Sequence, residues 1–291
     1  MILQLTNNKL YISIDSLGAQ LMSLRDLVGT EYLWQGDEKY WKGRSPILFP
    51  IVGSLKNKKT YIDGLEYTMP QHGLARISEF KLKKNLTDSA VYTFSSNDET
   101  KKSYPFDFEL EVTYSVSDFS LIVSFCVINK DSKSMPFGLG GHPAFNIPIF
   151  SDENFENYKI KFEKTENCDS PVVDQKLCTI ISKERISALD NTNFINLKHE
   201  LFYNDALVLE NLKSRSVSMY SVETGRGIKM DFDGFDYFGI WQAKDAPFVC
   251  LEPWTSTATL DVEDDDLRHK RGIIELAPGE TKEFCYKITI L

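Results

Sequence analysis

Hydrophobic and polar positions alternate along much of the chain, most clearly between residues 106 and 129. Apolar residues occupy every second position over 108–116, polar Ser117 and Asp118 follow, and the same alternation returns over 121–127. Because successive side chains of a strand point to opposite faces, each arm can bury one face. The stretch therefore predicts a long antiparallel hairpin that lines a core.

Shorter runs with strand-like patterns occur elsewhere. They are LYISID (10–15), AQLMSLRDL (19–27), AVYTFSS (90–96), RSVSMYSV (215–222), GIKMDF (227–232) and EFCYKITIL (283–291). The pairs Asp63-Gly64 and Asp233-Gly234 predict hairpin turns, because both tolerate the positive φ that tight turns require. Many strands with few helices indicate an all-β fold, specifically a large antiparallel β-sandwich.

Helical signals are sparse. SKERISALD (182–190) and NFENY (154–158) are short candidates that could also be loop excursions. Residues 150–200 are the least patterned part, and we expect a long excursion across the sheet there. No internal repeat or low-complexity linker divides the chain, so residues 1–291 are predicted to form a single domain.

Composition agrees with a sheet protein and narrows its surroundings. The chain has 19 Phe and 13 Tyr, and its hydrophobic fraction of 42% excludes a disordered chain. A net charge of −9, without basic runs interleaved with aromatic residues, disfavours a nucleic-acid partner. The chain lacks the patterns of a secretion signal and of a membrane span. Five scattered cysteines without a CxxC pair suggest reduced thiols, so we expect a cytoplasmic protein with no membrane partner.

Two of the four histidines stand in unusual settings. His142 lies in GLGGHPAFNIP and His72 in MPQHGLAR, and Gly or Pro beside each allows a ligand to approach closely. Either residue could instead be a hydrogen-bonded histidine that braces a loop. His199 has no obvious partner in the sequence, and His269 lies in a charged run, so neither is a candidate for chemistry.

Four charged residues are further candidates. Glu252, in FVCLEPWTSTAT, follows an apolar run; a half-buried carboxylate has a raised pKa and can act as a base, although a strand-end ion pair would fit as well. Asp205, in LFYNDALVLENL, suits ligand binding or turn initiation. Arg44 and Arg76 lie beside Gly-containing turns and offer donors for sugar hydroxyls, a carboxylate or a phosphate. The tryptophans could stack on a sugar or pack the core: Trp34, Trp41, Trp241 and Trp254.

Common motifs for other chemistry are absent from the sequence. There is no HExxH, Cys/His quartet, GxxxxGK[ST], GxSxG or GxGxxG. No zinc site, nucleotide loop or hydrolase elbow is therefore implied, and we expect neither a metal nor a cofactor. The remaining candidates, a histidine, a glutamate, arginines and tryptophans, suit proton transfer on a polar ligand.

Five segments together carry a family resemblance. In chain order they are WKGRSPILFPIVG, MPQHGLAR, GLGGHPAFNIP, YNDALVLE and VCLEPWTSTA, spread from residue 41 to 259. The chain resembles the aldose 1-epimerase (galactose mutarotase-like) family, most closely its LacX-type branch. HPAFN followed by LEPW is the more specific part, whereas HGLAR also occurs in the related hexose-6-phosphate mutarotases.

The resemblance implies a β-sandwich whose concave face holds a sugar and exchanges the α- and β-anomers of a free aldose. It implies that His142 is the general acid that protonates the ring oxygen. Glu252 would be the general base that takes the proton from the C1 hydroxyl. By the same resemblance Asp205 grips sugar hydroxyls, and three further residues line the pocket: Arg44, His72 and Arg76.

Departures from the family pattern keep the substrate open. Galactose mutarotases proper carry a second histidine in an Asn-x-His type segment, where this chain has QHGLAR. Arg44 and Arg76 together could hold a phosphate, as in hexose-6-phosphate mutarotases. The expected partner is a small aldose (galactose, glucose or a hexose phosphate), and the protein could be a monomer or a homodimer. A non-catalytic carbohydrate-binding protein is an alternative, disfavoured by the presence of both His142 and Glu252.

Overall fold

The largest layer of the computed structural model, which describes residues 1–291, is an antiparallel sheet of nine strands. The predicted hairpin lies at its centre, with Phe125 opposite Val112, and along both arms buried positions alternate with half-exposed ones. In sheet order the strands are β15 (Thr179–Asn196), β14 (Tyr158–Asp174), β17 (Ser216–Ser221), β18 (Gly227–Asp231), β22 (Thr281–Ile290), β10 (Ser120–Asn129), β9 (Phe108–Ser117), β8 (Ser89–Ser95) and β7 (Lys81–Asn85).

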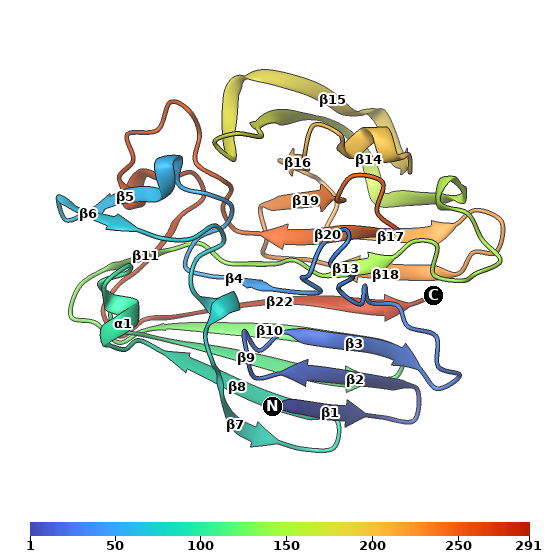
Figure 1. Cartoon of the computed structure of the whole chain (residues 1–291), viewed down its shortest axis with the longest axis horizontal. Helices are drawn as coiled ribbons and strands as arrows, with labels where there is room; N and C mark the ends of the chain where they lie inside the picture. The colour runs from blue at the N-terminus through green and yellow to red at the C-terminus, as the bar shows by residue number, and fades with distance from the viewer.

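Two smaller sheets cover one face of this layer (Figure 1). The first contains β1 (Ile2–Thr6), β2 (Leu10–Asp15) and β3 (Leu21–Asp26). The second contains β16 (Leu207–Glu210), β19 (Tyr237–Trp241), β20 (Phe248–Trp254), β12 (Gly140–Gly141) and β4 (Ile47–Leu48), with β13 (Ala144–Asn146) also paired to β20. The Tyr114 hydroxyl of β9 donates to the Ala19 carbonyl at 2.7 Å. A side chain at Gly141 would meet the Tyr286 ring of β22 at 2.6 Å, so the layers touch directly. The predicted β-sandwich is confirmed.

Shorter elements fill the ends of the sandwich. They are the ribbons β5 (Lys59–Ile62) with β6 (Leu65–Thr68) and β11 (Met135–Phe137) with β21 (Ile274–Leu276), the helix α1 (Asp98–Lys101), and the 3-10 turns η1 (Lys56–Lys58), η2 (Ala75–Ile77), η3 (Phe155–Asn157), η4 (His199–Phe202) and η5 (Leu267–His269). Asp63-Gly64 forms the predicted hairpin turn between β5 and β6. The hairpin predicted at Asp233-Gly234 is wrong, because this turn connects β18 to β19, which belong to different sheets.

The excursion expected in the segment 150–200 is a regular element, because residues 158–196 form the long β-hairpin β14–β15. Residues 158–162 of β14 pair with β17, whereas the outer half of the hairpin leaves that sheet and runs beside β16, above β19 in Figure 1. The helix proposed for 182–190 is wrong: this stretch belongs to β15, with Ile186 opposite Ser170. Hydrogen bonds to β14 override its weak local helix preference. Of NFENY, only Phe155–Asn157 is helical, as a 3-10 turn.

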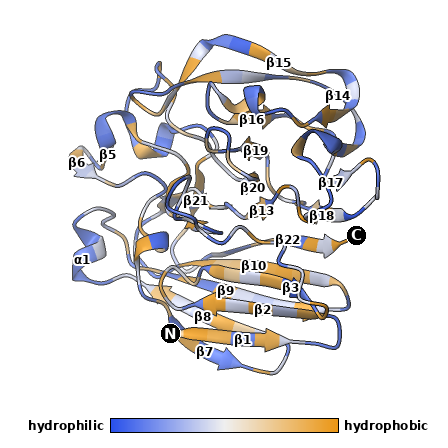
Figure 2. Cartoon of the chain, turned by 45° about the vertical axis from the view of Figure 1, so that its right-hand side comes forward, coloured by the Kyte–Doolittle hydropathy of each residue, from blue (hydrophilic) through white to orange (hydrophobic).

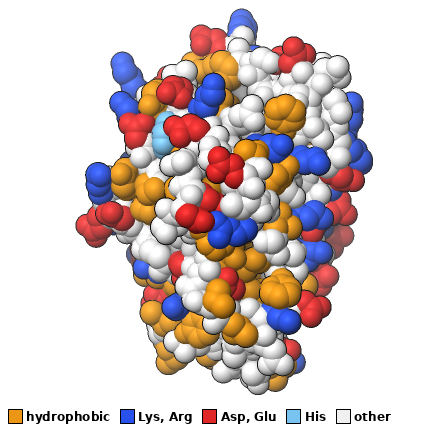
Figure 3. Space-filling view, turned by 90° about the vertical axis from the view of Figure 1, so that its right-hand side faces the viewer, with side chains coloured by type: hydrophobic (Ala, Val, Ile, Leu, Met, Phe, Trp, Pro, Cys, Tyr) orange, Lys and Arg blue, Asp and Glu red, His pale blue; other side chains and the backbone are white.

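Side-chain character follows these layers. Hydrophobic residues are prominent along β1, β2, β9 and β10 in Figure 2, where the three-stranded sheet lies over the nine-stranded one. The main core contains 64 buried residues, from Leu5 of β1 to Ile288 of β22. On the face in Figure 3, acidic and basic side chains are interspersed. No helix in the structure has both the length and the apolar character needed to cross a membrane.

Candidate active site

Strand β20 divides its side chains between the two faces of the six-stranded sheet. Val249 and Leu251 enter the main core. Because side chains alternate along a strand, Cys250, Glu252 and Trp254 point to the opposite face. The buried run FVCLEPW therefore serves two purposes, since Val249 and Leu251 pack the sandwich core whereas Glu252 and Trp254 face a cavity.

One row of paired residues crosses three neighbouring strands of this sheet. Val208 of β16 pairs with Gly239 of β19, which in turn pairs with Glu252 of β20. A side chain at Gly239 would meet the Trp254 ring at 2.5 Å, so only glycine accommodates the indole here. The Trp254 indole therefore lies over Gly239 on the outer face of the sheet, and Val208 belongs to the same apolar cluster as this ring.

A cavity of about 330 Å³ lies on this face, within the range of roughly 300–1,000 Å³ for small-molecule sites. Five of the six site residues proposed from the sequence line it: His72, Arg76, His142, Asp205 and Glu252. The remaining lining residues are Trp41, Pro46, Gly53, Gln71, Val173, Cys178, Ile180, Ala206, Val208, Trp241, Trp254 and Ala258. The fold thus gathers segments from both halves of the chain around a single space.

His142 and Glu252 form a close, buried pair in the cavity. The His142 Nε2 atom lies 3.3 Å from Glu252 Oε2, and the two residues are 7% and 1% exposed. Burial lowers the pKa of His142 well below its ordinary value, with smaller lowering contributions from His72 and from the Arg76 guanidinium. Burial raises the pKa of Glu252 well above its ordinary value, with a contribution from Asp205. Both side chains are therefore driven toward their neutral forms, as expected for proton-transfer groups in a cleft.

Aromatic rings fix the orientation of the His142 imidazole. Trp41 stacks on it, with ring centroids 4.9 Å apart and planes 23° apart, and Trp241 meets it nearly at right angles. A side chain at Gly43 would come within 2.3 Å of the Trp41 ring, so Gly43 allows the indole to fold back over His142. The His142 backbone N–H donates to the Pro46 carbonyl at 3.1 Å.

His72 occupies a strained turn and has a defined tautomer. Its φ is +63°, and its backbone N–H donates to the Gly53 carbonyl at 2.8 Å. Its Nδ1 accepts a hydrogen bond from the Gly53 N–H at 3.2 Å, so the neutral ring carries its proton on Nε2. Burial, together with the charge of Arg76, lowers the pKa of His72 to about 3. His72 is therefore a neutral hydrogen-bond donor at the cavity.

Arg76 and Asp205 add polar groups to the cavity. The Arg76 Nε donates to the Gln71 carbonyl at 3.1 Å, and the guanidinium makes no ion pair within the protein. Asp205 precedes β16 with a φ of +88°, and its Oδ1 accepts from the Ala206 N–H at 2.7 Å. Burial raises the pKa of Asp205. Both side chains retain hydrogen-bonding capacity for a ligand.

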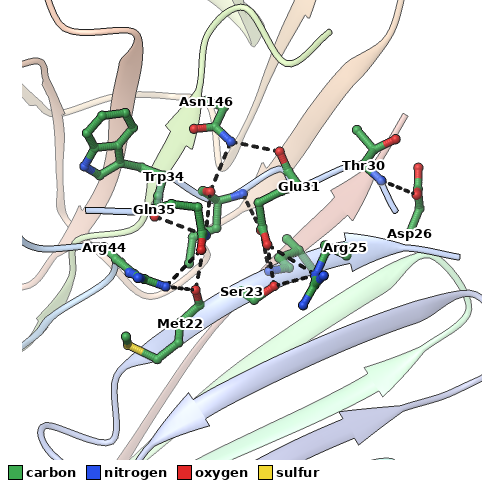
Figure 4. A network of polar contacts seen from close by, with 12 residues as sticks. Met22, Ser23, Arg25, Asp26, Thr30, Glu31, Trp34, Gln35, Arg44 and Asn146 are labelled. Carbon is green, nitrogen blue, oxygen red and sulfur yellow. Dashed lines mark hydrogen bonds and ion pairs between the residues drawn. The ribbon is translucent and has the colours of Figure 1, made fainter. Parts of the chain in front are cut away.

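The structure does not bring Arg44 to the cavity. Its guanidinium donates to the Met22 carbonyl at 2.7 Å and to Gln35 Oε1 at 3.0 Å, tying β3 to the segment after it (Figure 4). Trp34 is also outside the cavity, where its Nε1 donates to the Trp41 carbonyl at 2.9 Å. Neither Arg44 nor Trp34 lines the cavity.

Sequence reasoning missed the apolar part of the cavity. Val173, Cys178 and Ile180 come from the turn end of hairpin β14–β15, in the segment that lacked a clear pattern. The paired apolar residues flanking that turn, Val172-Val173 and Ile180-Ile181, were the available signal. His199 does have partners: its Nδ1 is 2.9 Å from Gln242 Oε1 and its ring stacks on Phe155.

Potential metal-ligand atoms of His142, Cys250 and Glu252 lie within 4.8 Å of one another. Burial raises the pKa of the Cys250 thiol well above its ordinary value, with a contribution from Glu252. A protonated thiol is a poor ligand, because metals bind the thiolate. The group therefore suits proton transfer better than metal binding.

The fold defines the class of the protein. The structure is similar to a galactose mutarotase related enzyme from Lactobacillus acidophilus, with a TM-score of 0.94 and 31% identity over 100% of this chain and 97% of that one. It is also similar to a galactose mutarotase-like protein from Lactobacillus casei, with a TM-score of 0.90 and 30% identity over the full length of both chains. The protein is thus a galactose mutarotase-like β-sandwich.

Sequence comparison assigns the family. The model of the family described as aldose 1-epimerase matches residues 1–289. The plasmid-encoded protein LacX of Lactococcus lactis subsp. lactis is 36% identical over 301 aligned residues, covering 100% of both chains. The chain belongs to the aldose 1-epimerase family, a family of isomerase-type enzymes that act on sugars.

Proposed function

We propose that the protein is a mutarotase that interconverts the α- and β-anomers of a free aldose. The observation that carries this proposal is the buried His142–Glu252 pair, 3.3 Å apart at the cavity. Each residue has an atom without a hydrogen-bond partner in the protein, His142 Nδ1 and Glu252 Oε2. A buried polar atom without a partner is costly, so hydroxyl groups of a bound sugar would supply the missing hydrogen bonds.

The pair suits the proton balance of ring opening. A cyclic hemiacetal opens when the C1 hydroxyl loses a proton, the ring oxygen gains one, and the bond between C1 and the ring oxygen breaks. In the proposed roles His142 donates to the ring oxygen and Glu252 accepts from the C1 hydroxyl. The aldehyde end then turns about C1–C2, and closure on its other face reverses both transfers. These roles need a protonated His142 and an ionised Glu252, a state that the neutral pair reaches when Glu252 passes its proton to His142 across their 3.3 Å separation.

Other cavity residues would hold the sugar. The Nε2–H of His72 and the guanidinium of Arg76 are donors, whereas the carboxyl group of Asp205 can accept from hydroxyls. Trp41 and Trp241 offer ring faces beside His142. These groups suit a polyhydroxylated ligand and leave the reacting atoms to His142 and Glu252.

The cavity favours a free aldose over a hexose 6-phosphate. Because Arg44 is bonded elsewhere, Arg76 is the arginine that remains for a phosphate, and it shares the cavity with the carboxyl groups of Asp205 and Glu252. A dianionic phosphate usually requires several cationic or backbone donors. All five cysteines are free thiols, which supports the proposed cytoplasmic location of this activity.

Exchange spectroscopy on anomeric protons tests the proposal with galactose, glucose and glucose 6-phosphate. Wild-type protein should speed anomer exchange of at least one free sugar, and His142→Asn and Glu252→Gln should each lose about 10²–10⁴-fold of that rate. His269→Asn is the control, because His269 is exposed, pairs with Asp264 and does not line the cavity. Sugar binding without faster exchange would instead identify a non-catalytic carbohydrate-binding protein.

A further inference from the structure

Strand β20 places two further hydrogen-bonding side chains beside Glu252. Cys250 and Trp254 lie two residues before and after it, and the alternation of the strand puts all three on one face. The Cys250 thiol is a weak donor, whereas the Trp254 indole carries an ordinary N–H donor. The proposed mechanism uses neither group. Glu252 is 1% exposed and must ionise to act as a base, and a buried carboxylate needs a donor to offset its lost hydration.

Two glycines fix the Trp254 ring across the strand that carries Glu252. Gly140 of β12 pairs with Trp254 on one side, and Gly239 of β19 pairs with Glu252 on the other. A side chain at Gly140 would meet the indole Cδ1 at 2.6 Å, and a side chain at Gly239 would meet Cε2 at 3.1 Å. Nε1 is the ring atom that is bonded to both of these carbons. The indole nitrogen therefore lies over β20 between the two glycines, on the face from which the Glu252 side chain rises.

The Trp254 N–H and the Glu252 carboxyl group are complementary. Trp254 is 6% exposed, and neither its Nε1 nor Glu252 Oε2 has a hydrogen-bond partner of good geometry in the protein, although a buried indole N–H usually has one. Burial raises the pKa of Glu252 well above its ordinary value, Asp205 raises it further, and the Trp254 N–H opposes both. A carboxylate has about four acceptor sites, so a sugar hydroxyl can bond to Glu252 at the same time.

We propose that Trp254 is a positioning residue of the acid–base pair, whose indole N–H donates to the Glu252 carboxylate once Glu252 has passed its proton to His142. The bond holds Glu252 in the ionised form that accepts the proton of the C1 hydroxyl. Hydrogen bonds to a charged acceptor are shorter and stronger than neutral ones, so the bond strengthens when Glu252 ionises. Trp254 keeps its own proton throughout, and the proton balance of ring opening is unchanged. The inference rests on the proposed mutarotase function and adds a residue to its machinery.

The indole proton of Trp254 reports this bond directly. The chain has 4 Trp, so their indole N–H resonances can be followed singly by NMR in the wild-type protein from pH 5 to pH 10. The Trp254 resonance should move to lower field as Glu252 ionises, and it should stay fixed in Glu252→Gln. Trp34 is the internal control, because its Nε1 already donates to the Trp41 carbonyl at 2.9 Å. A Trp254 resonance that does not move with pH in the wild type, or that moves equally in Glu252→Gln, would overturn the inference.

Trp254→Phe removes the N–H and retains an aromatic ring. In this variant kcat/KM at neutral pH should fall by about tenfold, the loss expected for one hydrogen bond to a charged group. The active pair holds one proton, and activity is lost at alkaline pH when this proton leaves Glu252. Without the donor this loss should occur about one pH unit higher, a shift that a merely distorted cavity would not produce. Trp34→Phe is the matched control, because it removes a buried indole N–H outside the cavity, and the alkaline limb of its profile should stay at the wild-type pH.

The outcomes separate this inference from the proposed function. If sugars exchange but the ratio of wild-type to Trp254→Phe kcat/KM is constant across pH, the positioning role is refuted and the mutarotase stands. If no sugar exchanges faster than in buffer, the mutarotase proposal fails. The indole titration, which needs no sugar, then still decides whether Trp254 donates to Glu252.

Discussion

Replacing Glu252 with Gln should abolish activity and at the same time stabilise the fold at neutral pH. Loss of one of two proton-transfer groups is expected to lower kcat by about 10²–10⁴-fold, equivalent to about 3–5 kcal/mol in the activation barrier. The stability effect has a separate origin. Burial raises the pKa of Glu252 well above 4.5, so the folded protein resists ionisation of this carboxyl group.

The sign of the stability effect follows from proton binding. Between pH 4.5 and the raised pKa, the folded chain holds the Glu252 proton more tightly than the unfolded chain does. The free energy of unfolding therefore falls as pH rises through this window, by about 1.4 kcal/mol for each pKa unit of difference. Glutamine does not ionise, so the variant escapes this loss. Its melting temperature relative to wild type should increase from pH 4.5 to pH 7.5, by roughly 2 °C for each kcal/mol.

Thermal unfolding followed by circular dichroism at pH 4.5, 6.0 and 7.5 measures this difference, with kcat from anomer exchange on the same samples. Glu153→Gln is the control with the opposite sign. Burial raises the pKa of Glu153, but hydrogen bonds from Thr224 and Tyr158 and the Arg226 guanidinium outweigh it and lower the pKa overall. The melting temperature of Glu153→Gln relative to wild type should therefore decrease from pH 4.5 to pH 7.5. A Glu252→Gln melting difference that is constant across the three pH values would refute the raised pKa.

Three further predictions concern the loops around the cavity. The pKa of His72 is near 3, whereas the unfolded histidine takes up a proton near pH 6.5, so the free energy of unfolding should fall by about 2 kcal/mol from pH 7 to pH 5. Asparagine tolerates the φ of +63°, and the His72→Asn variant should not show this fall in urea unfolding. Gly73→Ala should cost more than about 2 kcal/mol, since its Cβ would lie 2.4 Å from a backbone carbonyl, whereas Gly64→Ala has open space and should cost only about 1–2 kcal/mol in thermal melts. A thiol reagent followed by mass spectrometry should label Cys178 and spare the buried Cys250 in the folded protein, and a bound sugar should slow labelling of Cys178. Equal labelling of both cysteines would contradict the burial of Cys250.

Features that depend on neighbouring residues could be predicted from the sequence. The alternation over 106–129 predicted β9 and β10, because a strand of period two exposes its pattern locally. Asp63-Gly64 predicted a hairpin for a similar reason, since its positive φ values are an intrinsic preference. His142 and Glu252 were recognisable from the Gly, Pro and Trp residues beside them and from the family resemblance. Their 3.3 Å separation was not, because it arises when β12 pairs with β20.

Side-chain direction and distant pairing required the tertiary structure. Arg44 and Arg76 stand in similar sequence settings, yet only Arg76 reaches the cavity, because Met22 and Gln35 hold the Arg44 guanidinium elsewhere. Residues 182–190 read as a short helix until pairing with β14 made them a strand. The sequence by itself determined the sheet-rich class and the residues capable of acid–base chemistry, since both follow from local pattern and side-chain type. The tertiary structure alone decided which of these residues line one cavity and which apolar side chains line it with them, because long-range strand pairing brings distant segments together.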